Sequence, residues 1–291
     1  MMRIAYHLGV HCTDDDRLVR TLHRNKDLLA EAGIEVPAPE RYRNLIRDTA
    51  IQLKGQAAPT ETQALVLDQI MEAEVADRLV LSWENFLAFP AWAVKGQLYR
   101  TGGDRMRAIR NIFPDIEAEF FIGLRNPATY LPELHRRQRG RPYDEFIEGT
   151  DPLNLRWSDL ILNLRERNPE VQITVWADED TPLIWPEVLQ AVADLSEDIA
   201  LDGENDLLAS LMTGDGMIRL ASYLDAHPPQ TMGQRRRIVS AFLDKFAQTE
   251  KLDMSVELPG WTEDMVTTMT ETYERDMAYI ATLPGVTYLA P

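Results

Sequence analysis

The sequence predicts a three-layer α/β fold, in which a central, mainly parallel sheet lies between two layers of helices. Short apolar segments alternate with longer segments that have the apolar spacing of amphipathic helices, and this alternation is typical of a parallel sheet. The 291 residues are enough for one large α/β core with additions. We place that core at residues 1–195 and expect a mainly helical region packed on it at 196–291.

The expected strands are short apolar segments, and the expected helices have apolar residues three and four positions apart. Pro132 is expected to kink or restart one of these helices. The pair Gly102-Gly103 is interpreted as a turn or hinge. The strands are expected at 4–10, 78–82, 118–124, 171–176 and 286–289, and the helices at 16–32, 60–76, 127–137, 157–167, 185–195, 206–212, 217–226, 234–247 and 262–283.

Composition narrows the classes of partner. The formal net charge is −17, with 30 Lys and Arg against 47 Asp and Glu. Nucleic-acid binding depends on cations that neutralise phosphates, so we expect no nucleic-acid partner. No apolar run of about 18 residues is present, so we expect no membrane span. Cys12 is the only cysteine, which predicts a reducing, cytoplasmic compartment. With nucleic acid and membrane excluded, the expected partner is a small molecule or a protein.

A phosphate-binding loop would lie at the end of the first expected strand. The strand breaks at Gly9 and the chain then leads into a helix, an arrangement in which backbone N–H groups and the helix dipole hold an anion. Instead of a lysine, it carries Asp14, Asp15 and Asp16. One interpretation is helix capping by Thr13 or Asp14, with acids in the first helical turn. Another is a divalent cation held by the three carboxylates.

Three stretches of the chain resemble the sulfotransferase family, in particular its uncharacterised bacterial members. The family opens with a strand, then His-x-Gly-x-x-Lys-Thr-Gly-Thr-Thr-Ser-Leu-Gln and a helix, and His7, Gly9, Thr13 and Leu18 are in register with that pattern. The segments 81–87 and 121–130 are similar to the family's second strand end and to its 3′-phosphate contact. The resemblance covers roughly residues 1–200, and it implies a P-loop-like fold and the donor 3′-phosphoadenosine 5′-phosphosulfate.

The same register places acidic and neutral residues where the family binds that donor. Cys12 stands where the family has its loop lysine. The 3′-phosphate contact keeps Arg125 but has Glu133 where the family has a serine. A carboxylate about 4 Å from a bound phosphate costs several kcal/mol at an effective dielectric of about 20. The remaining departures replace the loop glycine and its two hydroxyl residues, and they are Asp14, Asp15 and Asp16.

These departures predict a sulfotransferase-like protein with an eroded donor site, which binds a ligand or a protein without catalysis. The alternative is an active transferase that moves a sulfuryl group to a hydroxyl acceptor. Glu84 would then be the general base, because it follows the second expected strand at the carboxyl edge of the sheet. If Ser82 instead caps a short helix, Glu84 only decorates its first turn.

An active transferase would need cations other than the family's lysine. Arg17, Arg125 and the basic stretch at 135–141 could supply them. That stretch could attract a small anion, or it could be a solvated helix end. The donor-site residues carried by the resemblance are therefore Gly9, Thr13, Arg17 and Arg125. No metal site is predicted, because His7 and His11 would lie about 13 Å apart on an extended strand. A metal-dependent enzyme that uses the aspartates is the third alternative.

Overall fold

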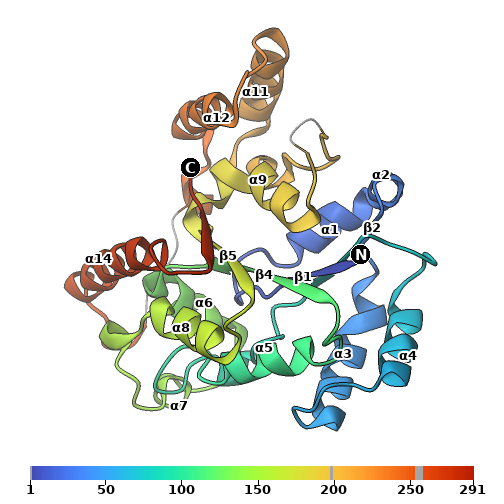
Figure 1. Ribbon diagram of the computed structural model, residues 1–291. Coiled ribbons are helices and arrows are strands. Elements are labelled where there is room, and N and C mark those ends of the chain that lie inside the picture. Colours follow the sequence, from blue (N-terminus) through green and yellow to red (C-terminus); the bar gives the residue numbers. More distant parts are fainter. Residues whose placement is uncertain (1, 197–198, 253–257) are drawn as a thin grey trace.

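A computed structural model describes residues 2–196, 199–252 and 258–291, and its centre is a six-stranded, all-parallel sheet (Figure 1). The strand order is β2-β3-β1-β4-β5-β6, which confirms the predicted α/β class. The five predicted strands are present, and the unpredicted β2 adds a short edge. The bounds are β1 (Arg3–His7), β2 (Ile34–Glu35), β3 (Arg78–Ser82), β4 (Glu117–Leu124), β5 (Gln172–Ala177) and β6 (Val286–Leu289).

One face of the sheet is covered by the larger helical layer, and the main hydrophobic core lies there. Tyr6 and Phe120 stack in this core, with ring centroids 5.0 Å apart. The layer contains α3 (Pro39–Leu53), α4 (Thr60–Ile70), α5 (Gly102–Arg110), α6 (Pro127–Arg137), α7 (Tyr143–Ile147), α8 (Trp157–Arg167) and α14 (Glu263–Ile280).

The opposite face of the sheet carries a second core, formed with α1 (Arg17–Arg24), α2 (Lys26–Glu31) and α9 (Thr181–Ala193). Alternation along the central strands separates the two cores. Ala5 and Val80 point to this side, whereas Ile4, Tyr6 and Leu79 point to the other. Figure 1 shows the three layers, with α1 and α9 on one side of the sheet and α5 and α8 on the other.

The region after α9 contributes to the structure in two different ways. The helices α10 (Asp206–Leu211), α11 (Gly214–Ala226) and α12 (Met232–Phe246) pack around a small core of their own, and the α11–α12 pair projects from the body in Figure 1. The short α13 (Thr249–Leu252) follows. By contrast, α14 packs in the main core, and β6 completes the sheet. Within the described ranges, no helix has the length and apolar character that a membrane span needs.

Two side chains of α14 connect it to the core. The carboxylate of Asp276 accepts hydrogen bonds from the backbone N–H groups of Trp157 and Ser158, at 2.7 and 3.0 Å, and so satisfies the first turn of α8. The Tyr273 hydroxyl lies 3.0 Å from the carbonyl oxygen of Leu124 at the end of β4. A helix close to the C-terminus therefore supports two elements of the α/β core.

Several predicted helices differ in detail from the observed ones. The helix expected at 16–32 is interrupted at Asn25, whose side-chain amide donates to the carbonyl oxygen of Thr21. The helix α6 runs through Pro132 without a restart. Thr262 caps α14, since its hydroxyl accepts from the Met265 N–H. The helix α3 was not predicted, although Pro39 at its first turn is a usual start signal.

The interpretation of Gly102 and Gly103 as a hinge was wrong, because both residues are buried in the first turn of α5. A Cβ on Gly103 would lie 2.5 Å from the backbone oxygen of Asn163 in α8, and one on Gly102 would lie 2.7 Å from a methyl carbon of Leu160. Glycine is therefore required here for close packing of two helices and not for flexibility.

Candidate functional site

The carboxyl edge of the sheet has a topological switch point between β1 and β4. The connection after β1 leads to α1 on one face, whereas the connection after β4 leads to α6 on the other face. In open α/β sheets, this reversal between neighbouring strands opens the crevice in which ligands bind. The residues of interest come from the β1–α1 loop (residues 8–16), from the segment after β3 and from the first turns after β4 and β5.

The backbone of the β1–α1 loop is held by the neighbouring strand β4. The Val10 N–H donates to the Gly123 carbonyl at 3.0 Å, and the Gly123 N–H donates to the Gly9 carbonyl at 2.7 Å. Gly9 has a φ of +90°, and a Cβ there would lie 3.1 Å from the Glu84 Cα. The glycine therefore allows the segment after β3 to lie directly against the loop.

Cys12, where the sulfotransferase resemblance leads one to expect a loop lysine, has a buried side chain. Burial raises the pKa of its thiol to about 12, so the thiol is neutral and unreactive at ordinary pH. Its carbonyl oxygen accepts a hydrogen bond from Arg125 Nη1, and Arg125 Nε donates to the Thr129 hydroxyl at 3.1 Å. The Thr13 hydroxyl donates to the Val10 carbonyl at 2.7 Å. Arg125 and Thr13 thus fix the loop from within the chain.

Each of the three aspartates has its own partner. The expected N-cap at Thr13 or Asp14 was wrong, because Asp16 is the N-cap residue; Asp14, two positions earlier, accepts from the Leu18 N–H in the first turn of α1 at 2.9 Å. The acids do not lie in the first turn of α1 as that interpretation supposed, because Asp16 has a left-handed backbone and the helix begins only at Arg17. Asp16 forms a two-pronged pair with Arg43 of α3, with N···O distances of 2.6 and 3.0 Å.

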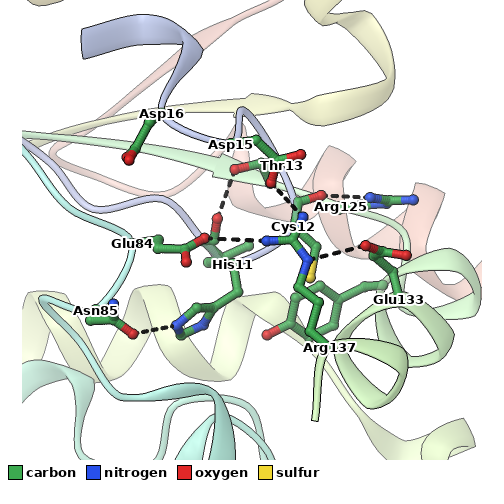
Figure 2. A network of polar contacts seen from close by, with 12 residues as sticks. His11, Cys12, Thr13, Asp15, Asp16, Glu84, Asn85, Arg125, Glu133 and Arg137 are labelled. Carbon is green, nitrogen blue, oxygen red and sulfur yellow. Dashed lines mark hydrogen bonds and ion pairs between the residues drawn. The ribbon is translucent and has the colours of Figure 1, made fainter. Parts of the chain in front are cut away.

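Asp15 belongs to an ion cluster centred on Arg137, the last residue of α6 (Figure 2). The Arg137 guanidinium pairs with Asp15, lies 3.0 Å from Glu133 and 3.7 Å from Glu84. Glu133 also accepts from Arg136 at 2.8 and 2.6 Å, and these contacts, together with Arg137, hold the pKa of its carboxyl below the usual range. We call these five residues the Arg137 cluster.

The Arg137 cluster bears on two expectations from the sequence: the role of the basic stretch at 135–141 and the effect of Glu133. Arg137 of the basic stretch is partly buried in ion pairs within the chain, whereas Arg136 and Arg139 are exposed at the end of α6, as the interpretation of a solvated helix end expects. Glu133, the departure from the family's serine, faces the Arg136 and Arg137 guanidinium groups. The cluster holds three carboxylates against two guanidinium groups, so it keeps an excess negative charge at the carboxyl edge of the sheet.

Glu84 lies in a turn after β3 and not in a short helix. The interpretation of Glu84 as a surface residue in the first turn of a helix capped by Ser82 was therefore wrong. The Ser82 hydroxyl, the supposed helix cap, bonds instead to His7 Nδ1 at 2.8 Å. Burial raises the pKa of the Glu84 carboxyl, and the Arg137 guanidinium opposes this. A partly buried carboxylate at the carboxyl edge remains a chemically reasonable proton acceptor.

His11 is part of a satisfied hydrogen-bond network. Its Nε2 lies 3.0 Å from the Asn85 Oδ1, its Nδ1 contacts the Tyr99 hydroxyl, and the Tyr130 hydroxyl donates to Tyr99 at 3.0 Å. Burial lowers the pKa of His11 to about 4, so the ring is neutral at pH 7. The network fixes the segment after β3 relative to the loop.

Sequence reasoning missed Asp178 and Glu179, which follow β5 at the same edge. Burial and the neighbouring Glu179 raise the pKa of Asp178 to about 7, whereas Arg125 opposes the shift. Glu179 accepts from the Asn126 N–H at 2.8 Å and from the Tyr273 hydroxyl at 2.7 Å. The signal was available, because acids directly after a buried strand lie at its carboxyl edge.

The predicted donor-site residues are therefore brought together, but most of their polar groups have partners in the chain. Gly9, Thr13 and Arg125 form or support the loop, and Arg17 begins α1. The aspartates diverge toward different partners, and no group of three metal-ligating side chains occurs in the described parts of the chain. Their geometry gives the metal-dependent alternative no support.

Comparison of the chain with protein-family models, with curated proteins and with solved structures returns no match. The interpretation of the site therefore depends on its own geometry and chemistry.

Proposed function

We propose that this chain is a sulfotransferase-like binding protein that does not use 3′-phosphoadenosine 5′-phosphosulfate. Its carboxyl edge would bind another small molecule or a protein without sulfuryl transfer. One observation carries the proposal: the loop that resembles a donor cradle is occupied by the chain's own charged groups, with the Asp14 carboxylate on the Leu18 N–H and the Asp15 carboxylate on Arg137.

Electrostatics supports this proposal. A phosphate that entered the loop would have to displace the Asp14 carboxylate from the start of α1 and would then lie close to it. Two unit charges about 4 Å apart repel by about 4 kcal/mol at an effective dielectric of 20. The buried Cys12 thiol supplies no compensating charge, because its pKa is about 12. The loss of even one charge-assisted contact costs a further 1.5 to 3 kcal/mol or so.

The test is isothermal titration calorimetry with 3′-phosphoadenosine 5′-phosphate. We expect no binding to the unmodified chain at millimolar nucleotide, and micromolar affinity would contradict the proposal. A variant that restores the family's residues (Cys12→Lys, Asp14→Gly, Asp15→Thr, Asp16→Thr) provides the matched comparison. If the loop frame is intact, this variant gains affinity for the nucleotide. Circular dichroism of both proteins checks that the fold is kept.

An active transferase is the second candidate, and Glu84 favours it. The pKa of its carboxyl is raised and its backbone lies against the loop at Gly9, which suits a general base for a hydroxyl acceptor. This candidate requires Arg137 to leave the carboxylates and bind the donor instead. The same titration separates the two candidates, since a transferase must bind the nucleotide product in its unmodified form.

A further inference from the structure

A separate cavity lies behind the segment after β3, between α3 and α5. Its volume is about 170 Å³. Three aromatic side chains line it: Trp83, Phe86 and Phe89. The Trp83 ring is nearly perpendicular to both phenylalanine rings, with centroid separations of 5.7 and 6.1 Å and interplanar angles of 82° and 87°. An apolar cavity of about 150 Å³ is enough to hold benzene, so this one suits a single aromatic ring.

The charged side chains that line this cavity are all cationic. They are Arg47 and Lys54 from the α3 side and Arg105 from α5. Arg47 donates to the exposed carboxylate of Asp48, whereas Lys54 and Arg105 form no ion pair with any part of the chain that the structure describes. In a protein with a net charge of −17, such a local excess of positive charge favours an anionic ligand.

Asn85 also lines this cavity, and its side-chain amide carries a neutral hydrogen-bond donor. Its carbonyl oxygen lies 3.0 Å from His11 Nε2, which directs the amide and leaves its NH₂ group without a hydrogen bond among the described residues. The His11 ring is itself fixed by Tyr99. A pre-positioned amide donor beside two cations is suited to a carboxylate, which accepts several hydrogen bonds at once.

We propose that this cavity binds a small aromatic carboxylate. The ring would lie against the wall formed by Trp83 and Phe89, and the carboxylate would meet Lys54, Arg105 and the Asn85 amide. Pockets of this kind, mostly apolar with a few convergent polar groups, are the usual form of small-molecule sites. The proposal goes beyond the function proposed above and does not depend on whether the β1–α1 loop binds a nucleotide.

The test is calorimetric titration of the whole chain with three small probes: benzoate, benzyl alcohol and hexanoate. Benzyl alcohol keeps the ring without the charge, and hexanoate keeps the charge without the ring. We expect benzoate to bind with a dissociation constant below about 1 mM and at least tenfold more tightly than either of the others. Weaker binding of benzoate, or equal affinity for benzyl alcohol or hexanoate, would overturn the proposal.

Variants connect the binding to this cavity. The double change Lys54→Gln and Arg105→Gln should weaken benzoate at least tenfold, and Trp83→Phe should weaken it by a smaller factor. Lys245→Gln, which removes an exposed cation from α12, is the matched control and should leave the affinity unchanged. If the double variant binds benzoate as the unmodified protein does, the carboxylate is held elsewhere and the assignment is wrong.

Discussion

The Arg137 cluster and the aromatic cavity behind Trp83 lie close to each other but differ in whether their cationic side chains are paired. In the cluster, two guanidinium groups are held by three carboxylates of the same chain. In the cavity, Lys54 and Arg105 have no ion-pair partner in the described residues. The comparison shows that charge pairing is a better guide to a ligand site than resemblance to a known site. The cations of the first region are paired within the chain, whereas those of the second are available to a ligand.

The largest effect should come from removing the centre of the cluster. Arg137→Met leaves Asp15, Glu84 and Glu133 near one another without their shared cation. Breaking a fully buried pair costs about 3 to 5 kcal/mol, and we expect about 2 kcal/mol here because the side chain is partly exposed. Urea-induced unfolding measures the loss.

The neighbouring Arg139 provides the control for this variant, since it is exposed in the same basic stretch. Arg139→Met should change the free energy of unfolding by less than about 0.5 kcal/mol. If Arg137→Met is equally mild, the cluster does not stabilise the fold, and the comparison of the two regions fails.

A pH-dependent effect should come from Asp178, whose charged form is disfavoured first by burial and then by the neighbouring Glu179. The folded pKa of Asp178 is about 7, above its ordinary value, so the folded state binds this proton more tightly than the unfolded state. Its contribution to stability is therefore complete at low pH and is lost as pH rises from about 4 to 7. Asp178→Asn should stabilise the protein by at least about 1 kcal/mol at pH 8, with the difference shrinking toward pH 4.

The measurement for this variant is the free energy of unfolding against pH, taken as a difference from the unmodified chain. His11 acts in the opposite sense, because its pKa is lowered to about 4 and its contribution is lost as pH falls from about 6.5 to 4. That term is common to both proteins and cancels. Asp225→Asn, at an exposed position in α11, should show no such pH-dependent difference.

The smallest effect is expected at the cavity. In the absence of benzoate, Lys54→Gln with Arg105→Gln should change stability by less than about 0.5 kcal/mol, because no ion pair in the described residues is lost. The same unfolding experiment measures it. A loss above about 1 kcal/mol would mean that these cations stabilise the fold, and the contrast with the cluster would disappear.

The sheet could be predicted from the sequence because its strands are continuous apolar runs. The β3 run Arg78–Ser82 and the end of β4 are buried on both faces. Strands buried in this way have continuous apolar sequences, which can be recognised without the structure. The first turn of α5 could not be predicted in this way. Gly102 and Gly103 have the local signature of a turn, and only the approach of Asn163, some sixty residues later, explains their presence in a helix.

The site was predictable in its location but not in its contacts. Local rules placed the N-cap at Thr13 or Asp14, whereas it is Asp16, and Asp14 accepts from the Leu18 N–H from two positions earlier. The partners of the next two aspartates are distant in sequence: Arg43 pairs with Asp16, and Arg137 pairs with Asp15 across 122 positions. Such pairs are set by the packing of α3 and α6 against the loop, which no short-range pattern encodes.

The attachment of α14 sets a practical limit on how the chain can be divided. A fragment that ended after α9 would expose the whole edge of β5, leave the first turn of α8 without the Asp276 carboxylate, and uncover the apolar surface now buried under Tyr273 and Met277. We expect such a fragment to aggregate through the open strand edge. Excision of the α11–α12 projection alone, with its ends rejoined, is the deletion that the rest of the protein should tolerate.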